Sequence, residues 1–172
     1  MKLSPTLEAA FNAQILMEFE SVYAYLQMAA DLDHANWPGF AAWMHLQSQE
    51  EWMHATKFTD FVLQRGGRVK LEPLAAPQSD LSVPLTAFEH ALGHEQRVSA
   101  SISALYGQAL GESDFASLPL LQWFVNEQVE EEDSVGRIVE RMRAVGTDTT
   151  GLMILDRELA ARRPVSSLGA PA

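Results

Sequence analysis

The segment from Phe40 to Phe61 places two ionisable side chains where a helix would bury its apolar face. Residues three or four apart share one face of a helix, and this face reads Phe40, Met44, Gln47, Glu51, His54, Phe58, Phe61. A carboxylate that is buried in its ionised form without a partner is strongly destabilising. Glu51 and His54 lie one turn apart in the middle of the face, so the segment predicts a bound metal ion as the compensating charge.

The composition narrows the classes of partner and site. The net charge of −11, from 12 Lys and Arg against 23 Asp and Glu, argues against nucleic acid as the main partner, because phosphate backbones require a basic surface. The absence of cysteine excludes disulfides, thiolate ligands and iron–sulfur clusters. No apolar run approaches the roughly 18 residues of a membrane span, and the first residues lack an apolar signal segment. We therefore expect a cytoplasmic protein with no membrane partner.

The 172 residues predict a single domain, 1–172, made of helices. Proline at helix starts and glycine after helix ends mark most boundaries, and the expected helices are 5–34, 38–65, 84–110, 114–145 and a shorter 149–161, before a flexible tail at 163–172. Residues 68–83 show no helical period, and a connection that long fits a crossover between bundle ends. The predicted fold class is all-α: a four-helix bundle with a long crossover between helices two and three and a short fifth helix.

Each of the four long helices carries one glutamate near the middle of its apolar face. These are Glu18, Glu51, Glu95 and Glu131, at similar distances from their helix starts, so packing the helices side by side brings them to one level. Any one of them could be a buried acid paired with Lys or Arg, yet the middles of the four faces contain neither residue. Four such carboxylates raise one another's pKa values or hold cations, and we interpret them as a metal centre.

The ligand types point to particular metals. Carboxylates and one imidazole, without sulfur, suit iron or manganese, with zinc as a competitor. Glu51 faces the centre and can bridge two ions, while His54 ligates one of them. Three further acids border the centre: Glu50 beside Glu51, and Glu127 and Glu130 one turn apart. We interpret them as a further, more hydrated metal position, against the alternative of a solvated acidic surface.

These residues belong to stretches that resemble the non-haem ferritins of bacteria and archaea over nearly the whole chain. The matching stretches are Asn12-x-Gln14-x3-Glu18 with Ser21 and Tyr25, Gln49-Glu50-Glu51-x2-His54-Ala55, His94-Glu95-Gln96, and Gln122-Trp123-Phe124-Val125-Asn126-Glu127-Gln128-x-Glu130-Glu131. Together they are highly specific. The resemblance implies a ferritin-like bundle with a ferroxidase centre inside each subunit. It also implies a cage of 24 subunits that stores or detoxifies iron as a ferric mineral.

The resemblance further implies a role for individual side chains. Glu18, Glu51 and His54 match the ligands of the first iron, with Glu51 bridging, and Glu95 and Glu131 match those of the second. In outline, two Fe(II) ions bind, O2 or H2O2 takes their electrons, and the Fe(III) pair moves on into the mineral.

A third iron site is implied by the same resemblance. Glu50, Glu127 and Glu130, with Glu131 shared, match the third site of bacterial members, and Gln128 matches the amide beside the second iron. These assignments are what the resemblance to non-haem ferritins implies.

Aromatic residues near the centre have two readings each. Tyr25 matches the tyrosine beside the centre, and a core tyrosine bonded to Glu95 is an equally good account. Trp123 matches an aromatic near the site, where core packing explains it at least as well. Bacterioferritin binds haem through a methionine just after the bridging glutamate, but that position is Trp52 here, and Met53 lies about 100° further round the helix. Haem is therefore not expected, and Trp52 is interpreted as a subunit contact or as an ordinary buried tryptophan.

Other classes of helical protein offer alternatives to an iron-storage function. A non-storage di-iron oxidase or peroxidase, as in rubrerythrin-like proteins, normally carries a second Glu-x-x-His on its fourth helix. Here that helix has Glu127-x-x-Glu130 and Gln128-x-x-Glu131, and no cysteine-bound iron module is present. A haem-containing bacterioferritin is a weaker alternative. The remaining rival is a non-catalytic helical interaction module whose acids are structural.

One more pair of residues has metal-binding spacing. His90 and His94 lie at i and i+4, but no carboxylate completes a site, and we interpret them as ordinary helix residues.

Overall fold

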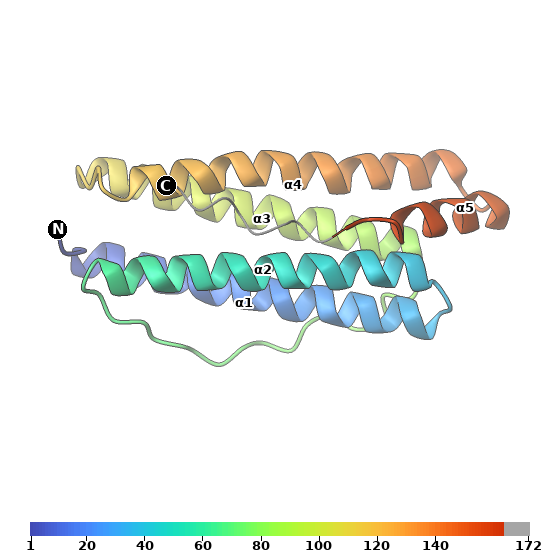
Figure 1. Cartoon of the computed structure of the whole chain (residues 1–172), viewed down its shortest axis with the longest axis horizontal. Helices are drawn as coiled ribbons and strands as arrows, with labels where there is room; N and C mark the ends of the chain where they lie inside the picture. Colours follow the sequence, from blue (N-terminus) through green and yellow to red (C-terminus); the bar gives the residue numbers. More distant parts are fainter. Residues whose placement is uncertain (164–172) are drawn as a thin grey trace.

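The computed structural model describes residues 1–163 and consists of four long helices and one short one (Figure 1). Their bounds are α1 Pro5–His34, α2 Pro38–Gln64, α3 Pro84–Gly111, α4 Leu118–Val145 and α5 Thr149–Leu159. No strand occurs in the described part of the chain. The predicted all-α four-helix bundle with a short fifth helix is confirmed. The tail expected at 163–172 lies, apart from Arg163, outside the described residues.

The connection between α2 and α3 runs the length of the bundle. In Figure 1 it leaves the left-hand end of α2 and reaches the start of α3 at the right-hand end, so these two helices run parallel. Short turns join α1 to α2 and α3 to α4, and each of these pairs is antiparallel. This is the crossover predicted from the unpatterned segment at 68–83. No helix among the described residues is long and apolar enough to cross a membrane.

Local sequence signals account for most of the helix boundaries. Each long helix has proline in its first turn, where the missing N–H has no helical partner in any case. At α1, Ser4 Oγ also accepts a hydrogen bond from Leu7 N at 3.1 Å. Gly66 and Gly146 follow α2 and α4 with φ of 66° and 62°, a left-handed conformation that glycine adopts without strain.

The fourth helix begins at Leu118, later than the residue 114 expected from the sequence. Residues 114–117 form a turn that polar contacts hold in place. Ser117 Oγ donates to Asp114 Oδ2 at 2.6 Å, and Arg65 Nη2 donates to Asp114 Oδ1 at 2.7 Å. Because Arg65 directly follows α2 and is 49 positions from Asp114 in the sequence, the sequence near residue 114 does not contain this constraint.

Two apolar clusters fill the bundle, one toward each end. One includes Tyr25, Phe40, Met44, Phe88, Val139 and Met142, and the other includes Leu7, Phe11, Phe58, Leu105, Leu121 and Phe124. On every long helix the predicted carboxylate, imidazole and amide ligands fall between the two clusters. The bundle therefore has a polar level at mid-height, closed above and below by hydrophobic side chains.

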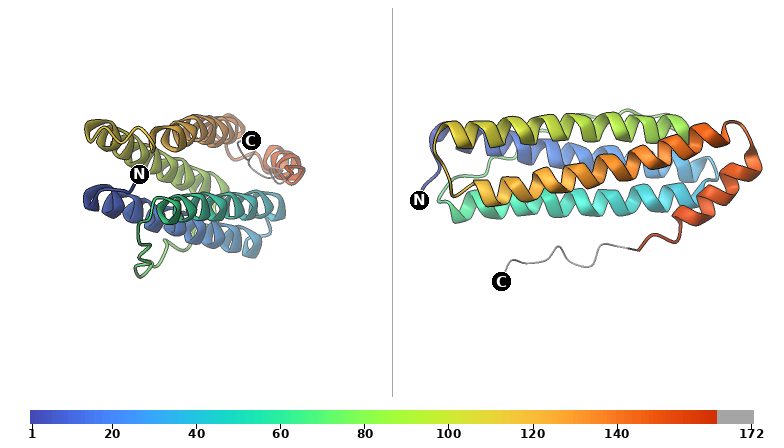
Figure 2. Two further views of the ribbon diagram at one scale, coloured as in Figure 1. Left: turned by 60° about the vertical axis from the view of Figure 1, so that its left-hand side comes forward. Right: turned by 90° about the horizontal axis from the view of Figure 1, so that it is seen from above.

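The short helix α5 docks at the beginning of α2, as the right-hand view of Figure 2 shows. Asp156 Oδ1 accepts a hydrogen bond from Phe40 N at 2.8 Å, which satisfies a backbone donor in the first turn of α2. Gly39 allows this approach, because a Cβ at that position would lie 1.9 Å from the Asp156 carbonyl oxygen. Leu155 adds a buried apolar contact.

Candidate metal centre

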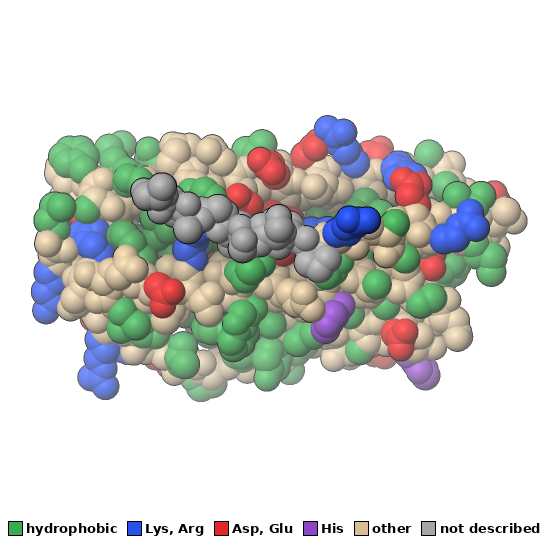
Figure 3. All heavy atoms as spheres, in the orientation of Figure 1, with side chains coloured by type: hydrophobic (Ala, Val, Ile, Leu, Met, Phe, Trp, Pro, Cys, Tyr) green, Lys and Arg blue, Asp and Glu red, His purple; other side chains and the backbone are tan. Residues whose placement is uncertain are grey.

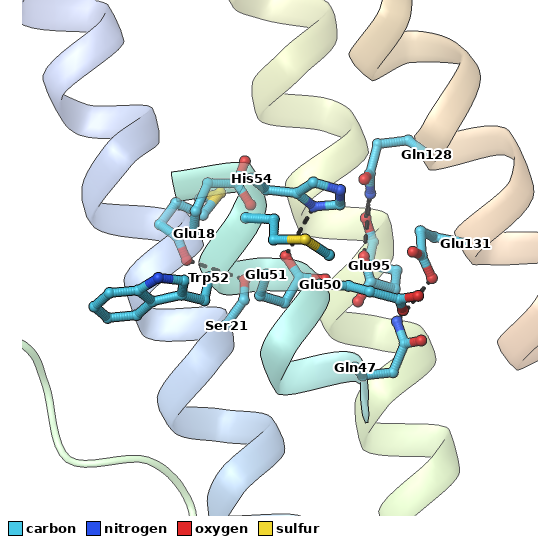
Figure 4. Close-up of polar contacts among 12 residues, drawn as sticks. Glu18, Ser21, Gln47, Glu50, Glu51, Trp52, His54, Glu95, Gln128 and Glu131 are labelled. Carbon is cyan, nitrogen blue, oxygen red and sulfur yellow. Dashed lines mark hydrogen bonds and ion pairs between the residues drawn. The ribbon is translucent and has the colours of Figure 1, made fainter. Parts of the chain in front are cut away.

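The polar level collects the predicted centre residues from all four long helices (Figure 4). α1 contributes Glu18, α2 contributes Glu51 and His54, α3 contributes Glu95, and α4 contributes Gln128 and Glu131. All six side chains are buried. The structure thus brings together residues up to 113 positions apart in the sequence (131 − 18).

Glu18, Glu51 and His54 form the tightest group. One potential ligand atom from each lies within 4.8 Å of the others, and His54 Nδ1 is 3.3 Å from Glu51 Oε2. Glu18 Oε2 and Glu51 Oε1 are buried and receive no hydrogen bond from an N–H or O–H donor among residues 1–163. Buried carboxylate oxygens without donors are destabilising unless a cation satisfies them, and this geometry fits a metal ion.

Glu95 and Glu131 form the other half of the level and have more hydrogen bonds. Tyr25 Oη donates to Glu95 Oε1, and Gln128 Nε2 donates to Glu95 Oε2 at 3.1 Å. Gln47 Nε2 donates to Glu131 Oε2 at 2.8 Å. The bond between Tyr25 and Glu95 is the core contact anticipated for this tyrosine, and it fixes one carboxylate oxygen while leaving the tyrosine beside the centre.

Two amide side chains position carboxylates in a way that the sequence did not reveal. Gln14 Nε2 donates to Glu18 Oε1 at 2.7 Å, and its own carbonyl accepts from Ser101 Oγ at 2.6 Å. Gln47 plays the same part for Glu131. Both glutamines were visible as polar interruptions of an apolar face. Gln14 and Glu18 share α1, but the Ser101 that orients Gln14 is on α3, and Glu131, the partner of Gln47, is on α4.

The buried acids are electrostatically unsatisfied. None of Glu18, Glu51, Glu95 and Glu131 pairs with Lys or Arg within residues 1–163. Burial raises the pKa of Glu18 and Glu51 well above the usual range, and neighbouring carboxylates raise both further. Burial also raises the pKa of Glu95, and that of Glu131 to about 7, where the charge of Glu95 adds to the effect. Such a group of acids binds protons or cations in preference to standing ionised alone.

The raised pKa of Glu131 predicts a pH dependence of the metal-free protein. Between about pH 4.5 and 7 the native state holds a proton on Glu131 that the unfolded chain has lost. The contribution of Glu131 to the free energy of unfolding is therefore fully present below pH 4.5 and is lost as the pH rises through about 7. Glu131→Gln should reduce the difference in unfolding free energy between pH 5 and pH 7.5 by on the order of 2 kcal/mol. Denaturant unfolding at the two pH values measures it, and an unchanged difference would contradict the shift.

The acids predicted as a further position line a pocket of about 250 Å³ beside the centre. Glu50 is buried, Glu127 half-buried and Glu130 exposed, and burial raises the pKa of Glu50 and of Glu127. Glu50 also has a basic partner that the sequence did not suggest, because Arg162 Nη2 lies 2.6 Å from its Oε2. On the face seen in Figure 3, acidic and basic side chains are interspersed over α4 and α5.

Aromatic side chains enclose His54 on one side. The rings of Trp123 and Phe124 meet the imidazole edge-on, with centroids 5.7 and 5.4 Å away. Trp52 points away from the carboxylates (Figure 4), is 54% exposed and packs on Phe19. The alternative of an ordinary buried Trp52 is therefore wrong, and its exposed ring is available for a contact between subunits.

His94 is a buried structural residue next to the centre. Arg97 Nη2 donates to its Nδ1 at 3.0 Å, so the ring carries its proton on Nε2, which lies 2.7 Å from Ser21 Oγ. Burial and the charge of Arg97 lower the pKa of His94 to about 4. The neutral imidazole ties α3 to α1, a role that the i, i+4 spacing with His90 did not indicate.

Comparison with known proteins agrees with this geometry. The ferritin-like domain family matches residues 8–145. A bacterial non-heme ferritin of Bacteroides fragilis (strain 638R) is 37% identical over 160 residues, which are 93% of this chain and 99% of the relative. A bacterial non-heme ferritin of Staphylococcus epidermidis is 34% identical over 93% of this chain and 96% of its own length.

Solved structures show the same similarity in three dimensions. An open-pore ferritin from the archaeon Archaeoglobus fulgidus is 47% identical, with a TM-score of 0.92 over 94% of this chain and all of that one. A closed form of the same ferritin, engineered by mutagenesis, matches with the same TM-score and identity. With a family match over most of the chain and relatives well above 30% identity, the chain belongs to the ferritin family.

Proposed function

We propose that this protein oxidises Fe(II) at the polar level of each subunit and stores the product as ferric mineral inside a cage. The observation that carries the proposal is the set of four buried carboxylates and one imidazole without a Lys or Arg partner among the described residues. Oxidation raises the charge on each iron, and anionic oxygen ligands stabilise that increase. The non-heme ferritins that resemble the chain support iron as the substrate.

The two halves of the level suggest how a pair of iron ions would be held. In this proposal Glu18 and His54 bind the first ion, Glu95 and Glu131 the second, and Glu51 bridges them from α2. Each Fe(II) gives up one electron, so a pair supplies the two electrons that, with two protons, reduce O2 to H2O2 or H2O2 to water. The hydrogen bonds of Tyr25 and Gln128 hold Glu95 in place while charge changes beside it.

The neighbouring acidic pocket is proposed as the third iron position. Glu50, Glu127 and Glu130 line it together with Glu131, which belongs to both sites. The partial exposure of this group suits a hydrated ion in transit between the pair and the mineral.

The cage is proposed as a homo-oligomer of 24 chains in the cytoplasm. Support comes from the ferritins of similar sequence and structure and from an apolar groove between α1, α2 and the crossover. Its lining includes Phe19, Tyr23, Trp52 and Leu71, of which the last three are well exposed. Exposed apolar side chains gathered in one place are typical of a surface that another subunit covers.

Aerobic loading with Fe(II) tests the storage function. We expect the purified protein to elute as a particle of 24 chains and to retain many iron atoms per chain after desalting. A small oligomer that retains two irons per chain would favour a non-storage di-iron oxidase instead. Absence of both Fe(II) oxidation and bound iron would favour the structural interaction module.

A further inference from the structure

A fixed cation lies at the edge of the acidic pocket. Arg162 lies just beyond the end of α5 at Leu159, and its backbone N–H donates to Leu159 O at 3.1 Å. The guanidinium carbon lies 4.7 Å from the centre of the Trp43 ring, and Nη2 donates to Glu50 Oε2 at 2.6 Å. An aromatic face and a carboxylate hold the guanidinium from two sides.

The surroundings of Arg162 are otherwise acidic. Four glutamates line the pocket, and Arg162 is the single Lys or Arg among its lining residues in the described chain. Its Nη1 is buried and has no hydrogen-bond partner within residues 1–163. The ion pair of Arg162 is with Glu50, and no other Lys or Arg in the described lining neutralises Glu127 and Glu130, so these two carboxylates can attract a further cation.

We propose that Arg162 is a tethered cation that occupies the Glu50 side of the third metal position and is displaced when a divalent cation binds there. The inference rests on the function proposed above, since it concerns one of its three metal positions. A guanidinium and a metal ion on the same carboxylate repel each other as like charges. Because Arg162 is covalently attached, its local concentration does not fall on dilution, and it competes with metal under all conditions.

The competitor can leave without unfolding the bundle. The Arg162 side chain is 23% exposed, against 9% for that of Glu50. Arg162 lies outside α5, so release of its side chain breaks one ion pair and one ring contact. α5 keeps it within reach through the bond from Phe40 N to Asp156. Metal is therefore expected to fill the pair of positions around Glu51 first and the third position last.

Titration with Zn(II), which does not change oxidation state, tests the proposal on the metal-free full-length protein. Calorimetry should resolve tighter equivalents at the pair and one weaker equivalent per chain at the third position. Arg162→Gln should tighten the weaker equivalent about tenfold and leave the others unchanged, because a charge-assisted hydrogen bond contributes about 1.5 kcal/mol and that energy corresponds to about tenfold in affinity. Arg162→Lys, which keeps the charge, should change it less.

Arg143→Gln is the matched control, because it removes an exposed arginine that pairs with Glu89 and Glu140 away from the pocket. Its weaker equivalent should bind as in the wild type. The proposal that Arg162 competes with metal is overturned if Arg143→Gln tightens the weaker equivalent as much as Arg162→Gln does. It is also overturned if Arg162→Gln leaves the affinity of the weaker equivalent unchanged, or if neither the wild type nor Arg162→Gln binds a third equivalent. Failure of the wild-type protein to bind metal at the pair would overturn the proposed function instead.

Discussion

Replacing Glu51 with glutamine should abolish rapid Fe(II) oxidation and at the same time stabilise the metal-free protein. Glu51 lies beside Glu18 and His54, and the charges of Glu95 on α3 and Glu131 on α4 also act on it. The charge of Glu51 in turn raises the pKa of Glu18. In the proposed function Glu51 is a ligand of both ions, so its loss should slow oxidation by at least about 100-fold, as expected when a group that stabilises developing charge is removed. Stopped-flow absorbance after mixing with Fe(II) and air measures the rate.

The same substitution, Glu51→Gln, should raise the free energy of unfolding of the metal-free protein. An amide at residue 51 is close to isosteric with the carboxyl group and removes a buried acid whose raised pKa opposes folding at neutral pH, since its one basic neighbour within residues 1–163 is His54. We expect a gain of about 1–2 kcal/mol, or a few degrees in the thermal midpoint for a chain of this length. Asp60→Asn, which removes an exposed acid from the same helix, should change neither property. A Glu51→Gln protein that oxidises Fe(II) at the wild-type rate would remove Glu51 from the centre.

Replacing Gly39 with alanine should detach α5 from the bundle. The added methyl carbon would lie 1.9 Å from the carbonyl oxygen of Asp156, so α5 must move away. The displacement breaks the bond from Phe40 N to Asp156 and exposes Leu155. A lost helix-start hydrogen bond and a lost buried leucine together correspond to about 3 kcal/mol of local stability. Proteolysis after α4 should then be faster by about 100-fold.

Gly107→Ala provides the comparison for that result. Gly107 lies within α3, and a Cβ there would meet nothing within 4 Å. Alanine in a helix is more stable than glycine by roughly 0.5–1 kcal/mol, so this variant should resist proteolysis at least as well as the wild type. If Gly39→Ala leaves α5 as protected as Gly107→Ala does, the close packing of α5 on α2 is not required for its docking.

Helical periodicity was sufficient to predict the bundle and the level of the centre. Because residues three or four apart share a face, the apolar pattern identified each buried side, and the glutamate in the middle of each side identified the polar level. Glu18, Glu51, Glu95 and Glu131 all lie in the interior. The unpatterned crossover then fixed the order in which the helices run.

Contacts between distant segments could not be read from the sequence. Ser101 orients Gln14 from another helix, and Arg162, which is 112 positions from Glu50 in the sequence, reaches it because α5 docks on the start of α2. The start of α4 was misplaced for the same reason, since Arg65 stabilises the preceding turn from the end of α2. Each of these contacts depends on how helices pack, which a pattern within one helix does not contain.

We propose that the buried acids on the four long helices coexist because cations lie among them. Anomalous diffraction from crystals soaked anaerobically in a ferrous salt tests it most directly. We predict one iron peak among Glu18, Glu51 and His54 and a second between Glu51 and the carboxylates of Glu95 and Glu131. An interior without iron, or Glu51 and His54 turned toward solvent, would contradict the account.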